Sequence, residues 1–267
     1  MSLPDIGIGT WQNAEPDTCV ESVQTALEMG YRHVDTAQAY GNEAAVGEGI
    51  ATADVPREEI VLATKIHPEE TGVAYDEVLE ATQDSLDRLG VDTIDLLYVH
   101  WPTGNYDAEE TLPAFDELVD RGAIDHVGVS NFDVDLLDEA REHLDADLFA
   151  HQVEMHPFLQ QADLLEHAQT HEYDLVAYSP LARGRVLEHP EIESIADKHG
   201  VSEAQVSLAW LLSKDRVRVI PKATSEAHIR DNFEALDLEL DPEDVAAIDA
   251  IDRSERFVER AGAPWLA

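Results

Sequence analysis

Apolar and polar positions follow two alternating patterns along this chain, and each pattern predicts one kind of element. Short, continuously apolar runs, such as residues 60–66 and 94–100, are typical of strands that are buried on both faces of a parallel sheet. Between such runs lie longer stretches in which apolar residues recur every three or four positions, as in residues 75–89, which are followed by Gly90. The sequence therefore predicts strands that alternate with helices along the whole chain.

The predicted strands are residues 6–9, 33–35, 60–66, 94–100, 124–129, 148–153, 175–178 and 216–220. The predicted helices are residues 18–29, 42–53, 75–89, 109–120, 133–143, 161–171, 190–199, 203–213, 226–235 and 242–251. Such alternation over 267 residues predicts an α/β fold, a single-domain (β/α)8 TIM barrel, which usually takes ~250 residues. We expect the domain to span residues 1–267, with a C-terminal tail at about 252–267 that borders the active-site mouth.

An open doubly wound sheet is the alternative architecture for alternating strands and helices. Its phosphate-binding loop usually follows the first strand and has the pattern G-x-G-x-x-G. The corresponding segment here, GIGTWQ, has only the first two of these glycines. The barrel is therefore favoured.

Polar side chains stand at the carboxyl ends of the predicted strands. Asp35 and then Tyr40 follow the second strand, Lys65 closes the third, and His100 closes the fourth. A cation or an imidazole at the end of an apolar run would be costly if it only faced a core. Because the carboxyl ends of barrel strands meet at one mouth, we expect these four side chains to lie together. Each of them alone fits a structural role, but together they indicate proton transfer coupled to a reduction.

Metal chemistry has less support in the sequence. The segment HQVEMHP places two histidines five residues apart and lacks the HExxH spacing of zinc proteases, and a single cysteine offers no thiolate cluster. The segment VGVSNF lacks the G-x-S-x-G pattern of hydrolases. We therefore predict no metal site, and a metal-dependent barrel hydrolase or isomerase remains the remote alternative.

The charge of the chain is strongly one-sided. It has 57 Asp and Glu against 17 Lys and Arg, a formal charge of −40, and the acidic residues are spread through the predicted helices. At ~1 M salt the Debye length falls to ~3 Å, so that self-repulsion on such a surface is screened. The composition thus indicates adaptation to high salt, as in a halophile, with an ordinary acidic enzyme as the alternative. A surface this negative argues against nucleic acid as a partner.

Three further features of the sequence bear on where in the cell the protein is found. No apolar run approaches the ~18 residues of a membrane helix, and the start, MSLPDIGIGTW, lacks the basic and apolar segments of a signal peptide. Cys19 is the only cysteine, so that no intramolecular disulfide can form. We expect a cytoplasmic protein with no membrane partner.

Eight segments, in order, resemble the aldo-keto reductase family of prokaryotic type. They are GIGTWQ, GYRHVDTAQAYGNEAAVGEGI, LATKIH, IDLLYVHWP, HVGVSNF, HQVEMHPFLQQ, AYSPLARG and VIPKATS followed by IRDNF. The resemblance implies a monomeric barrel that reduces small aldehydes or ketones with NADPH, or with NADH. A cofactor-binding regulatory subunit with little turnover is the alternative within the same resemblance.

The resemblance also implies roles for the strand-end residues. Tyr40 would donate the proton, Lys65 and Asp35 would tune it, and His100 would orient the carbonyl. The nearby ammonium of Lys65 is expected to lower the pKa of the Tyr40 phenol, and Asp35 to hold that ammonium in place. A neutral His100 could donate a hydrogen bond to the substrate oxygen.

The resemblance further implies two sets of binding residues. The cofactor would contact Thr10, Asp35, Ser130, Asn131, Gln152, Tyr178, Ser179, Leu181, Arg183, Lys222, Thr224, Ser225, His228 and Asn232. The substrate pocket would be formed by Trp11, Tyr40, His100, Trp101 and Phe132, and its specificity by the loops and the tail around Trp265.

Two departures from the family pattern bear on these expectations. Many members that prefer NADPH have a serine directly after the lysine of the IPK segment and an arginine six residues beyond that lysine, where this chain has Ala223 and His228. A narrower preference for NADPH over NADH is therefore expected, with Lys222 and Arg230 as the remaining cations. The N-terminal hairpin that usually plugs the barrel bottom is shortened to MSLPDI, so that the resemblance does not predict how this end is closed.

Overall fold

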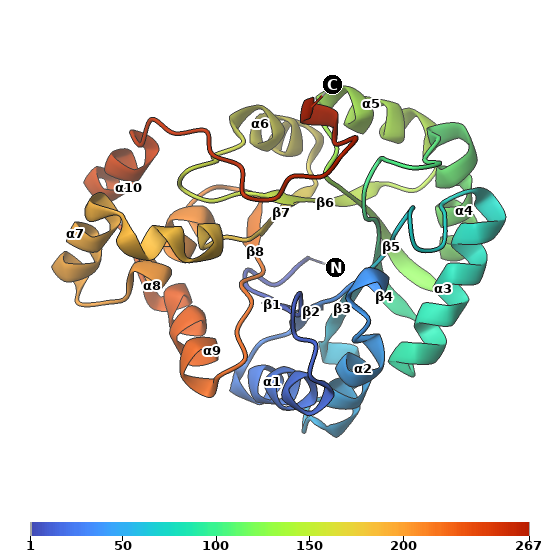
Figure 1. The fold of residues 1–267 in the computed structure, drawn as a ribbon, viewed down its shortest axis with the longest axis horizontal. Coiled ribbons are helices and arrows are strands. Elements are labelled where there is room, and N and C mark those ends of the chain that lie inside the picture. Colours follow the sequence, from blue (N-terminus) through green and yellow to red (C-terminus); the bar gives the residue numbers. More distant parts are fainter. Residues whose placement is uncertain (1, 267) are drawn as a thin grey trace.

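Eight parallel strands follow one another around a single sheet in sequence order, with the helices outside it, in the computed structural model, which describes residues 2–266 (Figure 1). The strands are β1 (Ile8–Gly9), β2 (His33–Asp35), β3 (Val61–Ile66), β4 (Ile94–Val99), β5 (Ile124–Ser130), β6 (Leu148–Glu154), β7 (Asp174–Tyr178) and β8 (Val217–Val219). The segment around β1 closes the sheet onto β8, because the N–H of Gly7 donates to the carbonyl of Val219 at 2.8 Å and the N–H of Gly9 donates to that of Pro221 at 3.1 Å. The predicted single-domain (β/α)8 barrel is confirmed.

The helices are α1 (Pro16–Met29), α2 (Glu43–Thr52), α3 (Tyr75–Leu89), α4 (Ala108–Asp120), α5 (Val134–His143), α6 (Ala162–His171), α7 (Pro190–His199), α8 (Glu203–Leu212), α9 (Glu226–Phe233) and α10 (Pro242–Asp249). The predicted ends of strands and helices differ from these by at most two residues. Short 3-10 segments were not predicted; those near the mouth are η1 (Gln38–Tyr40) and η3 (Ala182–Glu188). No helix among residues 2–266 is long and apolar enough to span a membrane.

Capping side chains fix where several helices begin. The carboxylate of Asp133 accepts the N–H of Leu136 at 3.0 Å at the start of α5, and the hydroxyl of Ser225 accepts the N–H of His228 at 3.3 Å at the start of α9. A side chain in this position satisfies one of the backbone N–H groups that have no partner within the helix.

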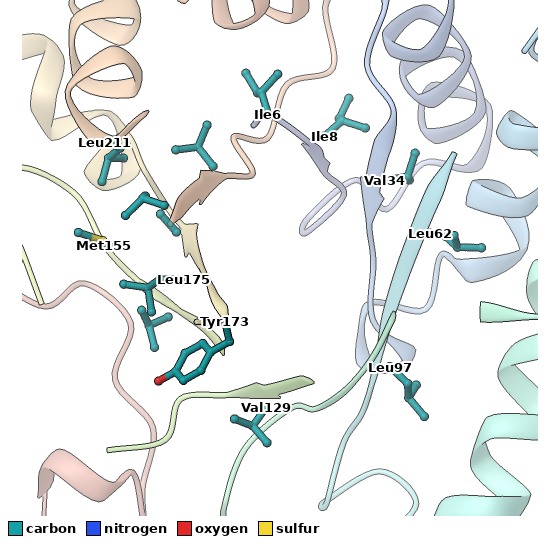
Figure 2. Packing of buried hydrophobic residues seen from close by; sticks show 14 of the residues in the cluster. Ile6, Ile8, Val34, Leu62, Leu97, Val129, Met155, Tyr173, Leu175 and Leu211 are labelled. Atoms are coloured by element: carbon teal, nitrogen blue, oxygen red, sulfur yellow. The ribbon is translucent and has the colours of Figure 1, made fainter. Parts of the chain in front are cut away.

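The apolar core has two layers, because side chains along each strand point alternately outward and inward. The outward set packs against the helices, and Figure 2 shows part of it, including Val34, Leu62, Leu97 and Leu175. The inward set fills the barrel and consists of Leu3, Val61, Ala63, Leu96, Tyr98, Ala150, Val176 and Ile220. The inward positions nearest the carboxyl ends are left for polar residues.

The short N-terminal segment closes the amino end of the barrel. Leu3 is only 3% exposed and packs in the inward cluster with Val61, at the start of β3. The segment that leads into β1 accordingly lies inside the ring of strands in Figure 1. Leu3 thus takes part in closing this end of the barrel.

Candidate active site

A cavity of about 480 Å³ opens at the carboxyl ends of the strands. It is lined by side chains from the ends of most strands and by three residues of the C-terminal tail, Val258, Glu259 and Arg260. Asp35, Tyr40 and His100 line it, and Lys65 lies buried beneath them. The topology thus brings the four strand-end residues together.

Lys65 and Asp35 form a buried ion pair at the floor of the cavity. The Lys65 Nζ donates to Asp35 Oδ1 at 2.5 Å and to the carbonyl of Thr36 at 2.6 Å, and the two side chains are 0% and 2% exposed. Gln152 Nε2 donates to the other carboxylate oxygen of Asp35 at 2.7 Å. Burial lowers the pKa of Lys65, while the charge of Asp35 and its hydrogen bond act in the opposite direction.

Tyr40 lies on η1, above this ion pair. The Lys65 Nζ is 5.3 Å from the centre of the Tyr40 ring, and the Tyr40 and His100 rings meet edge to face with their centres 5.8 Å apart. Burial, and then the charges of Asp35 and Tyr178, raise the pKa of Tyr40 well above its ordinary value. The expected lowering of this pKa is therefore wrong for this structure, because burial and the charge of Asp35 outweigh the stabilisation that the Lys65 ammonium can give to the phenolate. The phenol remains protonated, which is the state that a proton donor needs.

His100 is held neutral. Burial, and then the charges of Lys65, His67 and Arg260, lower the pKa of His100 well below its ordinary value. A neutral imidazole keeps one N–H that can donate a hydrogen bond. Its ring lies 5.0 Å from that of His67, which also lines the cavity.

Residues at the carboxyl ends of β5, β6 and β7 form a hydrogen-bonded group in the wall of the cavity. Asn131 Nδ2 donates to the carbonyl of His100 and to Ser130 Oγ, both at 3.0 Å, and Asn131 Oδ1 accepts from the Tyr178 hydroxyl at 2.8 Å. The hydroxyl of Ser130 donates to the Gln152 carbonyl at 2.9 Å. The structure thus places four of the expected cofactor residues in contact, and all four line the cavity.

The loop after β7 has an unusual backbone. Ser179, Ala182 and Arg183 have φ angles of 50°, 48° and 54°, in the left-handed region that residues other than glycine rarely adopt. The Arg183 guanidinium lies 4.9 Å from the centre of the Trp11 ring, so that these two side chains meet across one edge of the cavity. Ser179, Arg183 and Lys222 line the same cavity.

Several expected binding residues do not line the cavity. Thr10 is buried and donates from its hydroxyl to the carbonyl of Asp35 at 3.1 Å, and Phe132 is buried against the ring of Tyr106, with centres 5.2 Å apart. Both are buried beneath residues that line the cavity. The others lie beyond the cavity, Leu181 half-buried, Asn232 buried, and Thr224, Ser225 and His228 exposed near the start of α9.

The cavity also contains residues that the sequence analysis did not identify. His67 lies two positions beyond Lys65, so the alternation along β3 could have indicated that it faces the mouth. Glu70, Val258, Glu259 and Arg260 are likewise in the lining. The last three lie in an irregular segment, where no periodic pattern shows which side chains point inward.

The sequence matches the model of the aldo/keto reductase family over residues 5–253. It is 38% identical to the methylglyoxal reductase DkgB of Escherichia coli O157:H7 over 265 residues, which cover 98% of each chain. It is 37% identical to the uncharacterized oxidoreductase YtbE of Bacillus subtilis (strain 168), over 96% of this chain and 91% of the relative.

Solved structures agree with the sequence comparison. A putative 2,5-diketo-D-gluconic acid reductase B superposes with a TM-score of 0.94 at 35% identity, over 98% of this chain and 92% of that one. The aldo-keto reductase MGS-M4, from a Medee basin deep-sea metagenome library, gives a TM-score of 0.92 at 35% identity, over 97% and 95% of the two chains. The chain therefore belongs to the aldo/keto reductase family and is an NAD(P)H-dependent oxidoreductase built on a (β/α)8 barrel.

Proposed function

We propose that the protein reduces small aldehydes or ketones to alcohols with NADPH, and that Tyr40 donates the proton. The observation that carries this proposal is the buried Lys65–Asp35 ion pair beneath a protonated Tyr40, with a neutral His100 beside it. A relative of 38% identity is named a methylglyoxal reductase, which makes a vicinal dicarbonyl compound the first substrate to test.

The residues around the cavity fit a nicotinamide dinucleotide. Ser179 and Arg183, from the sharply turned segment after β7, line the cavity together with Lys222. The cations of Arg183 and Lys222 could hold a pyrophosphate there. Ser130, Asn131 and Gln152 would face the carboxamide, and the start of α9 the adenosine end.

When bound, the cofactor would supply a hydride to the carbonyl carbon, and negative charge would develop on the carbonyl oxygen. The N–H of neutral His100 orients this oxygen, and the Tyr40 hydroxyl gives it a proton, so that an alcohol forms. Lys65 stabilises the tyrosinate that remains until solvent returns the proton. The Asp35 carboxylate holds the ammonium at 2.5 Å and so fixes its position below the ring.

The cofactor preference follows from the positions near α9. Ala223 is buried and His228 exposed, so neither supplies the hydroxyl or the permanent cation that would hold a 2′-phosphate. Lys222 remains as one exposed cation. We therefore propose that NADPH is preferred but that NADH also serves.

The wider setting is also a proposal. The net charge of −40 supports an enzyme of a salt-rich organism, and we propose separately that the enzyme is cytoplasmic. We propose that the protein is a monomer and that residues 1–267 form one domain, in which residues 252–267 border the mouth of the barrel. Sedimentation in molar potassium chloride would contradict the monomer if it gave a larger species.

The direct experiment follows the consumption of NADPH and of NADH in molar potassium chloride with methylglyoxal and a panel of simple aldehydes and ketones. The proposal requires carbonyl-dependent turnover with NADPH. Tight NADPH binding without turnover on any carbonyl would instead indicate a regulatory subunit.

A further inference from the structure

Glu154, the last residue of β6, is a buried carboxylate that the proposed chemistry does not use. Its side chain is 0% exposed and does not line the cavity, although Gln152, two residues earlier, does. Burying a carboxylate is costly unless hydrogen bonds satisfy both of its oxygens. The partners of Glu154 therefore show what this residue is for.

Both carboxylate oxygens of Glu154 accept backbone N–H groups of the C-terminal tail. Oε1 accepts the N–H of Phe257 at 2.8 Å, and Oε2 accepts the N–H of Val258 at 3.0 Å. His156 Nε2 lies 3.2 Å from Oε1, and Arg256 Nη1 lies 4.0 Å from Oε2. Burial alone would raise the pKa of Glu154, but these hydrogen bonds outweigh burial and hold the pKa below its ordinary value.

The tail residues next to these contacts form part of the cavity wall. In Figure 1 the C-terminal segment, in red, runs from α10 past β7 and β6, where Glu154 ends its strand. Val258, which donates to Glu154, lines the cavity, as do Glu259 and Arg260 directly after it. The position of this wall relative to Tyr40 and His100 therefore depends on the attachment of the tail to β6.

The segment is also attached by the N–H of Glu255, which donates to the carbonyl of Phe158 at 2.8 Å, and by the Phe257 ring, 5.3 Å from that of buried His156. Its attachments through arginine side chains are more exposed. Arg260 pairs with Glu69, whose side chain is 54% exposed, and its guanidinium lies 5.5 Å from the centre of the Trp101 ring. The Arg256 guanidinium lies 3.7 Å from the centre of the Trp265 ring. Exposed ion pairs contribute little and are screened by salt, whereas the hydrogen bonds to buried Glu154 are shielded from both solvent and ions.

We propose that Glu154 is a positioning residue, which anchors residues 257–258 to the end of β6 and thereby holds the substrate side of the mouth in place. The effect on substrate binding rests on the proposed carbonyl reduction at this mouth, but the anchoring itself does not. Two backbone N–H groups need two acceptor oxygens. A glutamine at this position would offer one oxygen and turn an N–H₂ group toward the other donor, which breaks one of the two bonds.

Glu154→Gln tests this directly. Hydrogen exchange in the full-length protein should show the amides of Phe257 and Val258 exchanging at least about tenfold faster (~1.4 kcal/mol), with no change in the strands. The KM for a carbonyl substrate should rise about tenfold, with kcat and the Kd for NADPH nearly unchanged. Glu255→Gln is the matched control, since it removes the same charge from an exposed side chain two residues before Phe257.

A second pair of variants approaches the anchor from the tail, in case Glu154→Gln does not fold. Val258→Pro removes the N–H that Oε2 accepts, whereas Val258→Ala shortens the side chain and keeps the N–H. Only the proline variant should speed exchange at Phe257. Unchanged exchange in both Glu154→Gln and Val258→Pro would overturn the anchor, and faster exchange with an unchanged KM would overturn its role in substrate binding. Absence of turnover in the wild-type protein would count against the proposed function alone.

Discussion

Removal of the Lys65 ammonium should destabilise the protein strongly, and the size of the effect follows from the burial of its partner. Lys65→Met leaves the Asp35 carboxylate, which is 2% exposed, with Gln152 Nε2, at 2.7 Å, as its one side-chain donor among residues 2–266. Breaking a buried ion pair by removing one partner typically costs ~3–5 kcal/mol, because an uncompensated charge stays buried. At ~2–4 °C of Tm per kcal/mol for a chain of about this size, Tm should fall by ~6–20 °C.

The control is a lysine whose own side chain is exposed. Lys198 bonds Asp241 at 2.6 Å and the buried Asp244 at 2.7 Å, but its side chain is 45% exposed. Because Asp244 also keeps a contact of 2.7 Å with His199 Nε2, Lys198→Met should cost much less than Lys65→Met. Denaturant unfolding in molar salt measures both variants on one scale.

A double variant separates the buried charge from other effects of the substitution. Lys65→Met combined with Asp35→Asn removes both charges, and it should regain at least half of the stability that Lys65→Met loses while remaining inactive. The reasoning is refuted if Lys65→Met costs no more than Lys198→Met, or if the added Asp35→Asn change destabilises the protein further.

Three other predictions concern the cofactor, acid and salt. His228→Arg should tighten NADPH binding by ~1.5–3 kcal/mol through a charged hydrogen bond to the 2′-phosphate, with no gain for NADH; titration of both cofactors measures this, and equal gains would contradict it. Burial lowers the pKa of His33 to about 4 and that of His151 to about 3, from 6.5. As the pH falls, these histidines take up protons in the unfolded chain before they do so in the folded protein, so the free energy of unfolding should fall between about pH 6.5 and 4, by ~3 kcal/mol for His33 alone. In His33→Leu the free energy of unfolding should fall less over this range. An equal fall in the variant and the wild type would contradict the lowered pKa of His33. Finally, the chain has 57 acidic and 17 basic residues, and added salt screens the repulsion between the excess negative charges. Tm should therefore rise between dilute buffer and molar potassium chloride, and a flat or falling Tm would argue against adaptation to salt.

The fold could be predicted from the sequence because its two periodic patterns are strong. Continuous apolar strands such as β3 and β4, buried on both faces, leave few architectures other than a parallel barrel covered by helices. The cluster of polar strand-end residues followed from the same topology, since residues that end neighbouring parallel strands must meet. Lys65 and His100 were recognisable because each polar group ends an otherwise apolar run.

The features that could not be predicted depend on contacts between segments that are far apart in the sequence and have no periodic pattern of apolar residues. The N–H groups of Phe257 and Val258 meet Glu154 across about a hundred residues of sequence, and no pattern in the tail indicates this. The contact between Leu3 and the inward cluster of the barrel likewise joins residues that are far apart in the sequence, and no periodic pattern predicts it. The direction of the Tyr40 pKa was predicted wrongly because proximity to a cation was considered without the burial of the ring and the neutralising carboxylate.

Tyr40→Phe tests most directly whether Tyr40 supplies the proton, since the change removes one hydroxyl and keeps the ring. The measurement is kcat for reduction of a carbonyl substrate, with the Kd for NADPH measured on the same preparation. We predict a loss of ~10²–10⁴-fold in kcat, as expected for removal of a general acid, with the Kd nearly unchanged. A variant that keeps more than about a tenth of the wild-type kcat would contradict the role of Tyr40 as proton donor.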